Sequence, residues 1–142
     1  MTREQRIVTR LEAELPRDPG ALKGAAARAH SLPALLRRHG PVQALLFLAG
    51  KQGTDQDLAT WIVAGISSAI GSDELAAAAR YVRRPEAALP DYATFLAGLQ
   101  PAAYLLRREA AVEVAGWLKL LIVARTEGAK TPAPAAAAEG RS

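Results

Sequence analysis

The sequence predicts an all-α fold: a single compact bundle of about six helices, followed by a disordered C-terminal tail. Apolar residues recur three and four positions apart along most of the chain, and no stretch alternates polar and apolar residues as a half-buried strand does. At 142 residues the chain fits one domain that can bury a core without disulfides or metal. We therefore expect a helical domain over residues 1–126 and a tail over residues 127–142.

The first helix is expected between Thr2 and Leu15, where apolar residues follow helical spacing. Thr2 is suited to be its N-cap, and Gln5, three residues later, can complete a capping box. Two prolines and a glycine fall within residues 16–20, so a loop should follow, because these residues remove backbone donors and favour turns.

A Gly40-Pro41 step divides the next helical region. Residues 21–39 carry a broad apolar face that Pro33 interrupts, which predicts a kinked helix or two short ones. Gly40 can take the left-handed conformation that closes one helix, and Pro41 suits the first turn of the next, so we expect a sharp corner. A helix should then run to about residue 51, with inward side chains at Leu45, Phe47 and Leu48.

Four more helices are expected in the second half of the chain. Thr54 is a candidate N-cap, and Asp55 and Asp57 suit the first turn of a helix that continues to residue 70. Shorter helices should cover residues 73–82 and about 92–99, and the longest should cover residues 102–125. The apolar residues of this last helix that seek cover are Leu105, Val112, Ala115, Trp117, Leu118, Leu121 and Ile122. The alanine- and proline-rich residues after 126 include no large apolar side chain, which predicts disorder.

The net charge of +4 is concentrated in one part of the chain. Between Pro19 and Thr54 there are five cations and no acid, whereas the remainder has thirteen cations and fourteen acids. A basic stretch of this kind can attract a polyanion by neutralising phosphates, but ordinary solvated helix faces have the same composition.

No set of residues in the sequence predicts catalysis. The chain contains no cysteine, which excludes a thiol redox site or a zinc site with thiolate ligands, and its two histidines, His30 and His39, have no acid nearby in sequence. Ser67 and Ser68 lack the context of a nucleophile elbow, and no phosphate-binding glycine loop is present. We expect a non-enzymatic protein with no metal, no cofactor and no small-molecule substrate.

The expected location is the cytoplasm. No apolar run approaches the roughly 18 residues that a membrane span needs. The first residues mix charges and lead into no signal-like apolar region. No membrane partner is expected.

Two segments resemble a known family. Residues 32–51 contain Leu-Pro-Ala-Leu, then Gly40, then Gln-Ala-Leu-x-Phe-Leu, then Lys51. Residues 109–124 contain Glu-Ala, then Ala-x-Trp-Leu-Lys, then Ala124. Both resemble the small subunit of the type III-B CRISPR effector, the fifth protein of the Cmr complex. The chain departs from that pattern at Pro41, where the family tends to have leucine, and at Leu120, where arginine is common.

The resemblance implies a small helical, non-catalytic subunit of a ribonucleoprotein in antiviral defence. Copies of such a subunit stack into a filament beside the larger Cmr backbone subunits and help to hold the guide RNA and the target RNA. Lysines and arginines would neutralise phosphates without reading sequence, while base pairing with the guide supplies specificity.

Eight cations are candidate RNA contacts. Lys51 and Lys119 match positions of the family motifs, and the other six rest on local basicity. The candidates are Lys23, Arg28, Arg37, Arg38, Lys51, Arg107, Arg108 and Lys119. Core positions are expected at Leu32, Leu35, Gly40, Leu45, Phe47, Trp117 and Leu118.

Two alternatives remain open. The chain could be a helical adaptor that binds only protein through the apolar surface at residues 120–123, with a merely solvated basic stretch. It could also be the small subunit of another CRISPR effector type, although the two motifs fit that group less well.

Overall fold

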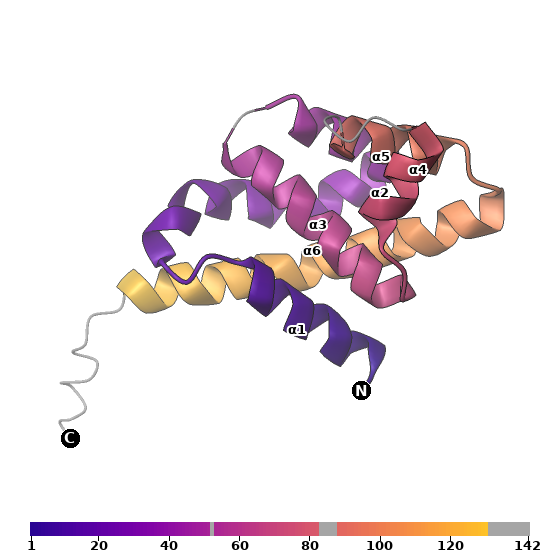
Figure 1. Cartoon of the computed structure of the whole chain (residues 1–142). Helices are drawn as coiled ribbons and strands as arrows, with labels where there is room; N and C mark the ends of the chain where they lie inside the picture. The colour runs from indigo at the N-terminus through magenta and orange to yellow at the C-terminus, as the bar shows by residue number, and fades with distance from the viewer. Residues whose placement is uncertain (52, 83–87, 131–142) are drawn as a thin grey trace, which may run out of the picture.

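Six α-helices and one 3-10 helix make up the described part of the chain, residues 1–51, 53–82 and 88–130 of the computed structural model (Figure 1). No strand occurs in these ranges. The elements are α1 (Arg3–Glu14), η1 (Pro19–Ala25), α2 (Ala26–Ala49), α3 (Thr54–Ile70), α4 (Glu74–Val82), α5 (Ala88–Ala97) and α6 (Pro101–Lys130). The expected all-α bundle is confirmed.

Helix α6 runs the length of the molecule, and α1, η1, α2 and α3 all pack against it (Figure 1). Near its C-terminal end the Arg125 guanidinium donates to the carbonyl oxygens of Leu15 and Pro16, which holds the loop after α1. The helix continues to Lys130, so the first four residues of the expected tail are helical. The rest of that expected tail, residues 131–142, lies outside the described residues.

The start of α1 has the capping box that the sequence predicts. The Gln5 backbone N–H donates to the Thr2 hydroxyl oxygen at 3.1 Å, and the Thr2 N–H donates to the Gln5 side-chain oxygen at 2.8 Å. Ile7 and Leu11 are fully buried, and α1 packs mainly against α3. The capping and the periodicity of this helix therefore both come from its local sequence.

Helix α2 differs from its predicted form in two ways. Residues 19–25 form the 3-10 helix η1, so the expected loop is shorter and the α-helix starts only at Ala26. Pro33 lies inside α2, and the backbone there stays helical. Its neighbours Leu32 and Leu36 are fully buried, and this packing offsets the backbone hydrogen bond that proline removes.

Gly40 divides α2 into two arms, which we call the first arm (residues 26–39) and the second arm (residues 41–49). Its φ of 79° and ψ of 166° are the only non-helical values inside α2. A Cβ atom at this position would lie 2.9 Å from the Tyr104 hydroxyl of α6. The corner expected at Gly40-Pro41 is confirmed, and it packs directly against α6.

The core lies between α6 and the helices around it. Leu32, Leu45 and Leu118 are fully buried, and Leu35 and Trp117 are partly buried against the core, as expected. The side chain of Val114 occupies the space beside Gly65, where an added Cβ would lie 2.4 Å from a Val114 methyl carbon. Helices α3 and α6 therefore approach each other closely at this point.

Two expectations about the core are wrong. Phe47 is 42% exposed, because the second arm buries Pro41, Ala44, Leu45 and Leu48, and Phe47 falls beside that row. Leu105 is 51% exposed on α6. Among the described residues, no helix is both long enough and apolar enough to cross a membrane.

Candidate nucleic-acid interface

Six of the eight candidate cations make no ion pair with any described acidic residue. They are Lys23, Arg37, Arg38, Lys51, Arg108 and Lys119. The first four are exposed on η1, on α2 and directly after it, and the other two are half-buried on α6. A cation without an acidic partner keeps its full charge available to an external anion. These six side chains are therefore the candidate cations whose charge no described acid offsets through an ion pair.

Arg37 and Arg108 meet where α2 crosses α6. The Arg108 guanidinium donates to the Arg37 carbonyl oxygen at 3.0 Å, and both side chains line one hollow of about 430 Å³. Glu109 and Glu113 also border this hollow, and Glu113 is paired with Arg3 at 3.0 Å. Two cations that are 71 residues apart in sequence are thus brought together.

Lys119 is another cation of α6 without an ion-pair partner among the described residues. It follows Arg108 by eleven residues, which is three helical turns, so the two side chains share one side of the helix. Their positions are about 16 Å apart along the axis at 1.5 Å per residue. That length matches a contact along several nucleotides of an extended strand rather than one bound phosphate.

Arg28 and Lys51 form a second basic site around an aromatic ring. The guanidinium carbon of Arg28 lies 5.0 Å from the centre of the Phe47 ring, and the Lys51 ammonium lies 5.1 Å from it. Arg28 is also paired with Asp55 at 3.3 Å. Cations at these distances are attracted to the electron-rich ring face.

Arg107 has an internal role. Its guanidinium donates to both carboxylate oxygens of Glu74, at 2.6 and 3.3 Å, and its side chain is only 14% exposed. Glu74 is fully buried and also accepts from the hydroxyls of Ser72 and Tyr92. This pair joins α6 to α4, and we leave Arg107 out of the interface because its charge is used inside the molecule.

The same network changes the acidity of Tyr92. Burial raises the pKa of the Tyr92 phenol well above its usual value near 10.0, and the negative charge and hydrogen bond of Glu74 raise it further, while Arg107 lowers it. The phenol therefore stays protonated in the folded protein and serves as a hydrogen-bond donor to Glu74.

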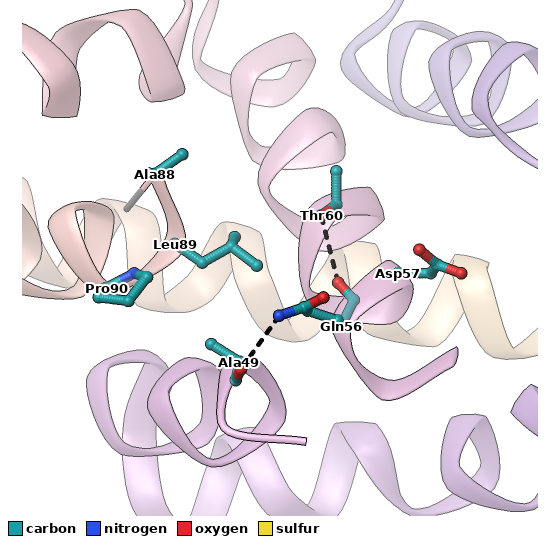
Figure 2. A pocket seen from close by; sticks show the side chains of 7 residues that line it. All are labelled: Ala49, Gln56, Asp57, Thr60, Ala88, Leu89 and Pro90. Carbon is teal, nitrogen blue, oxygen red and sulfur yellow. Dashed lines mark hydrogen bonds between the residues drawn. The ribbon is translucent and has the colours of Figure 1, made fainter. Parts of the chain in front are cut away.

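Figure 2 shows another hollow, of about 430 Å³, between the end of α2, the first turns of α3 and the start of α5. Its polar side chains are bonded within the protein: the Gln56 amide donates to the Ala49 carbonyl oxygen at 3.3 Å, and the Thr60 hydroxyl donates to the Gln56 carbonyl oxygen at 3.1 Å (Figure 2). Asp57 supplies its only carboxylate among the described lining residues. The described residues contain no group of three or more His, Asp or Glu side chains that could hold a metal ion.

Sequence reasoning missed the exposure of Phe47 and the acidic partners of Arg28 and Arg107. The first had a local signal, since Lys51 follows Phe47 by four residues and therefore shares its side of a helix. The acidic partners had none, because Asp55 is 27 residues from Arg28 and Glu74 is 33 residues from Arg107.

Comparison of the chain with protein-family models, with curated proteins and with solved structures gives no match.

Proposed function

We propose that the chain is a non-catalytic, RNA-binding small subunit of a type III-B CRISPR (Cmr) ribonucleoprotein. In this role several copies stack beside the backbone subunits and contact the phosphates of guide and target RNA. The support is the pair of sequence segments that resemble this family, together with the arrangement of those segments in space.

The observation that carries the proposal is the contact between the two segments. They lie far apart in sequence, yet α2, which contains the first, packs along α6, which contains the second. Arg37 of the first segment lines one hollow together with Glu109 and Val112 of the second. Just before the second segment, Arg108 donates to the Arg37 carbonyl oxygen and Tyr104 fills the space beside Gly40. The resemblance therefore concerns one packed unit of the molecule rather than two unrelated helices.

The cations along this unit support a phosphate-binding role. Arg37 and Arg108 lie at the α2–α6 seam, with Glu109 and Glu113 at the border of the same hollow, and Lys119 lies three turns further along α6. None of the three cations has an ion-pair partner among the described residues. Neutralising phosphates releases counterions, which gives affinity without selecting a base sequence. Such binding suits a subunit whose specificity comes from the guide RNA.

Salt-dependent binding of fluorescein-labelled single-stranded RNA, followed by fluorescence anisotropy, tests this proposal. The affinity of the wild-type chain should fall linearly on a log–log plot against salt, with a slope of about −0.7 for each phosphate neutralised. The double variant Arg37→Gln/Arg108→Gln should flatten the slope by about 1.4, the contribution of two phosphates.

The matched control is Arg10→Gln/Arg17→Gln, which removes the same charge from α1 and the loop after it. Helix α1 packs on α3 and α6, so this variant should keep the wild-type slope. An equal change in both double variants would show that only net charge matters. Wild-type binding without salt dependence, or no binding, would contradict an RNA-binding function.

A second candidate is a helical adaptor that binds only protein. It is favoured by three exposed leucines on α6: Leu105 at 51%, Leu106 at 43% and Leu120 at 58% exposure. Large exposed apolar side chains are typical of protein interfaces when they gather in a patch. An adaptor of this kind predicts partner binding that is insensitive to salt and no affinity for RNA.

A further inference from the structure

We infer that the inside of the α2 corner is a pocket for one unpaired nucleotide of RNA, with the base against Phe47 and the phosphate at Lys51. This inference rests on the proposed function and adds that the α2 corner selects unpaired RNA over duplex RNA. It is independent of the Arg37–Arg108 seam, which contacts phosphates only.

The shape of the corner provides the space. Leu35 and His39 of the first arm and Gln43, Ala44 and Phe47 of the second arm line a hollow of about 340 Å³. The arms meet at Gly40, and Arg28 reaches the Phe47 ring from the far end of the first arm. The hollow thus has apolar walls at Leu35, Ala44 and Phe47 and polar side chains at His39 and Gln43, and two cations lie over the Phe47 ring.

Phe47 supplies a surface for stacking. It is 42% exposed in a chain whose other aromatic side chains with described burial are buried or half-buried. Every nucleobase has a flat face that can stack on such a ring, so the contact tolerates any sequence. Inside a duplex both faces of each base are already stacked, so apart from the two end pairs only an unpaired nucleotide can use the ring.

Charge complementarity selects a phosphate-bearing ligand over an apolar peptide. Arg28 and Lys51 both lie over the Phe47 ring. Asp55 holds Arg28 there and offsets its charge, whereas Lys51 has no ion-pair partner among the described residues, so it can move to a phosphate and leave its place over the ring to a base. A neutral side chain entering the hollow would gain nothing from either cation. A nucleotide uses both the apolar wall and the positive charge.

Two polar side chains at the hollow can reach the edge of the base. The Gln43 amide offers both donors and an acceptor, and His39 offers a ring nitrogen. Neither side chain makes a hydrogen bond to another described residue. An amide can pair with different base edges by rotating, which keeps the pocket tolerant of sequence.

The test compares Phe47→Ala with Leu46→Ala, because Leu46 is the adjacent residue, is 47% exposed and does not line the hollow. Binding is measured by anisotropy to a ten-nucleotide single-stranded RNA and to a blunt RNA duplex. Phe47→Ala should weaken single-strand binding about fivefold or more, the loss of one stacked base. It should leave the salt slope unchanged because the ring carries no charge. It should leave the duplex affinity unchanged because the bases inside a duplex are already stacked. Phe47→Trp should keep the wild-type affinity, and Leu46→Ala should match the wild type on both RNAs.

Photocrosslinking of the wild-type chain to the same RNA containing 5-iodouridine gives a direct readout. The expected adduct lies on Phe47 and is located by mass spectrometry. Equal affinities of Phe47→Ala and Leu46→Ala for the single strand, or a loss by Phe47→Ala that is as large on the duplex, would overturn this pocket. Failure of the wild-type chain to bind any RNA would instead overturn the proposed function itself, so the two failures are distinguishable.

Discussion

The guanidinium carbon of Arg28 lies 5.0 Å from the centre of the Phe47 ring, although the two residues are nineteen positions apart in the same helix, α2. In a straight helix that separation would be about 28 Å at 1.5 Å per residue. The bend at Gly40 must therefore fold the second arm back toward the first. The contact shows that the Gly40-Pro41 step organises both the packing against α6 and the surface that faces solvent.

Replacing Gly40 with alanine should destabilise the protein by about 1–2 kcal/mol or more. The positive φ of 79° is costly for any residue with a Cβ, and that atom would lie 2.9 Å from the Tyr104 hydroxyl. The free energy of unfolding from urea denaturation measures the effect.

Gly116→Ala is the matched control for this change. Gly116 lies inside α6, and an added Cβ there meets nothing within 4 Å, so alanine should stabilise the protein by about 0.5–1 kcal/mol. If Gly40→Ala were as stable as the wild type, the bend would not depend on the positive φ of this glycine.

Removing the Arg107 charge should cost far more stability than removing the adjacent Arg108 charge. Arg107→Gln leaves the fully buried Glu74 carboxylate without its cation, and breaking a buried pair costs about 3–5 kcal/mol. Arg108→Gln loses one hydrogen bond to a backbone carbonyl, worth about 1 kcal/mol. Thermal unfolding of both variants, followed by circular dichroism, gives the comparison. Similar midpoints would mean that the Arg107–Glu74 pair does not support the fold.

Stability should fall at alkaline pH because of Tyr92. The pKa of its phenol is raised in the folded protein, first by burial and then by Glu74. Below the usual pKa near 10.0 both states keep the proton, so Tyr92 adds no pH dependence there. Above it the unfolded chain releases the proton while the folded chain retains it, so the free energy of unfolding drops by about 1.4 kcal/mol per pH unit.

Tyr92→Phe isolates this contribution. The variant should be less stable at neutral pH by about 1–2 kcal/mol, since Glu74 loses a hydrogen-bond donor. Between pH 10 and 11 its free energy of unfolding should fall less steeply with pH than that of the wild type. The two slopes should differ by the contribution of one proton, about 1.4 kcal/mol per pH unit. Urea denaturation across this range provides the values, and parallel curves for the two proteins would refute the assignment.

The features that the sequence predicts well are those encoded by neighbouring residues. The Thr2 capping box needs only Gln5, and the corner needs only Gly40 and Pro41, so both could be recognised from local patterns. The helical periodicity likewise located most of the core.

The features that the sequence does not predict depend on contacts between distant elements. Phe47 follows an apolar pattern, yet the second arm meets its neighbours through an adjacent row and leaves the ring at the surface. Arg107 is indistinguishable from Arg108 in sequence, and only the position of α4 gives it a buried partner. Local basicity therefore identified eight cations but could not separate those paired with an acid inside the fold from those without such a partner.

The most direct measurement of the central claim is assembly with a type III-B effector. Tagged chain is mixed with guide-loaded Cmr backbone subunits and labelled target RNA, and the complex is isolated by size-exclusion chromatography. We predict that several copies of the chain co-elute with the backbone and the RNA, and that the Arg37→Gln/Arg108→Gln variant retains less target RNA than the Arg10→Gln/Arg17→Gln control. Elution of the chain apart from both the backbone and the RNA, with no stacking of its own copies, would contradict the account.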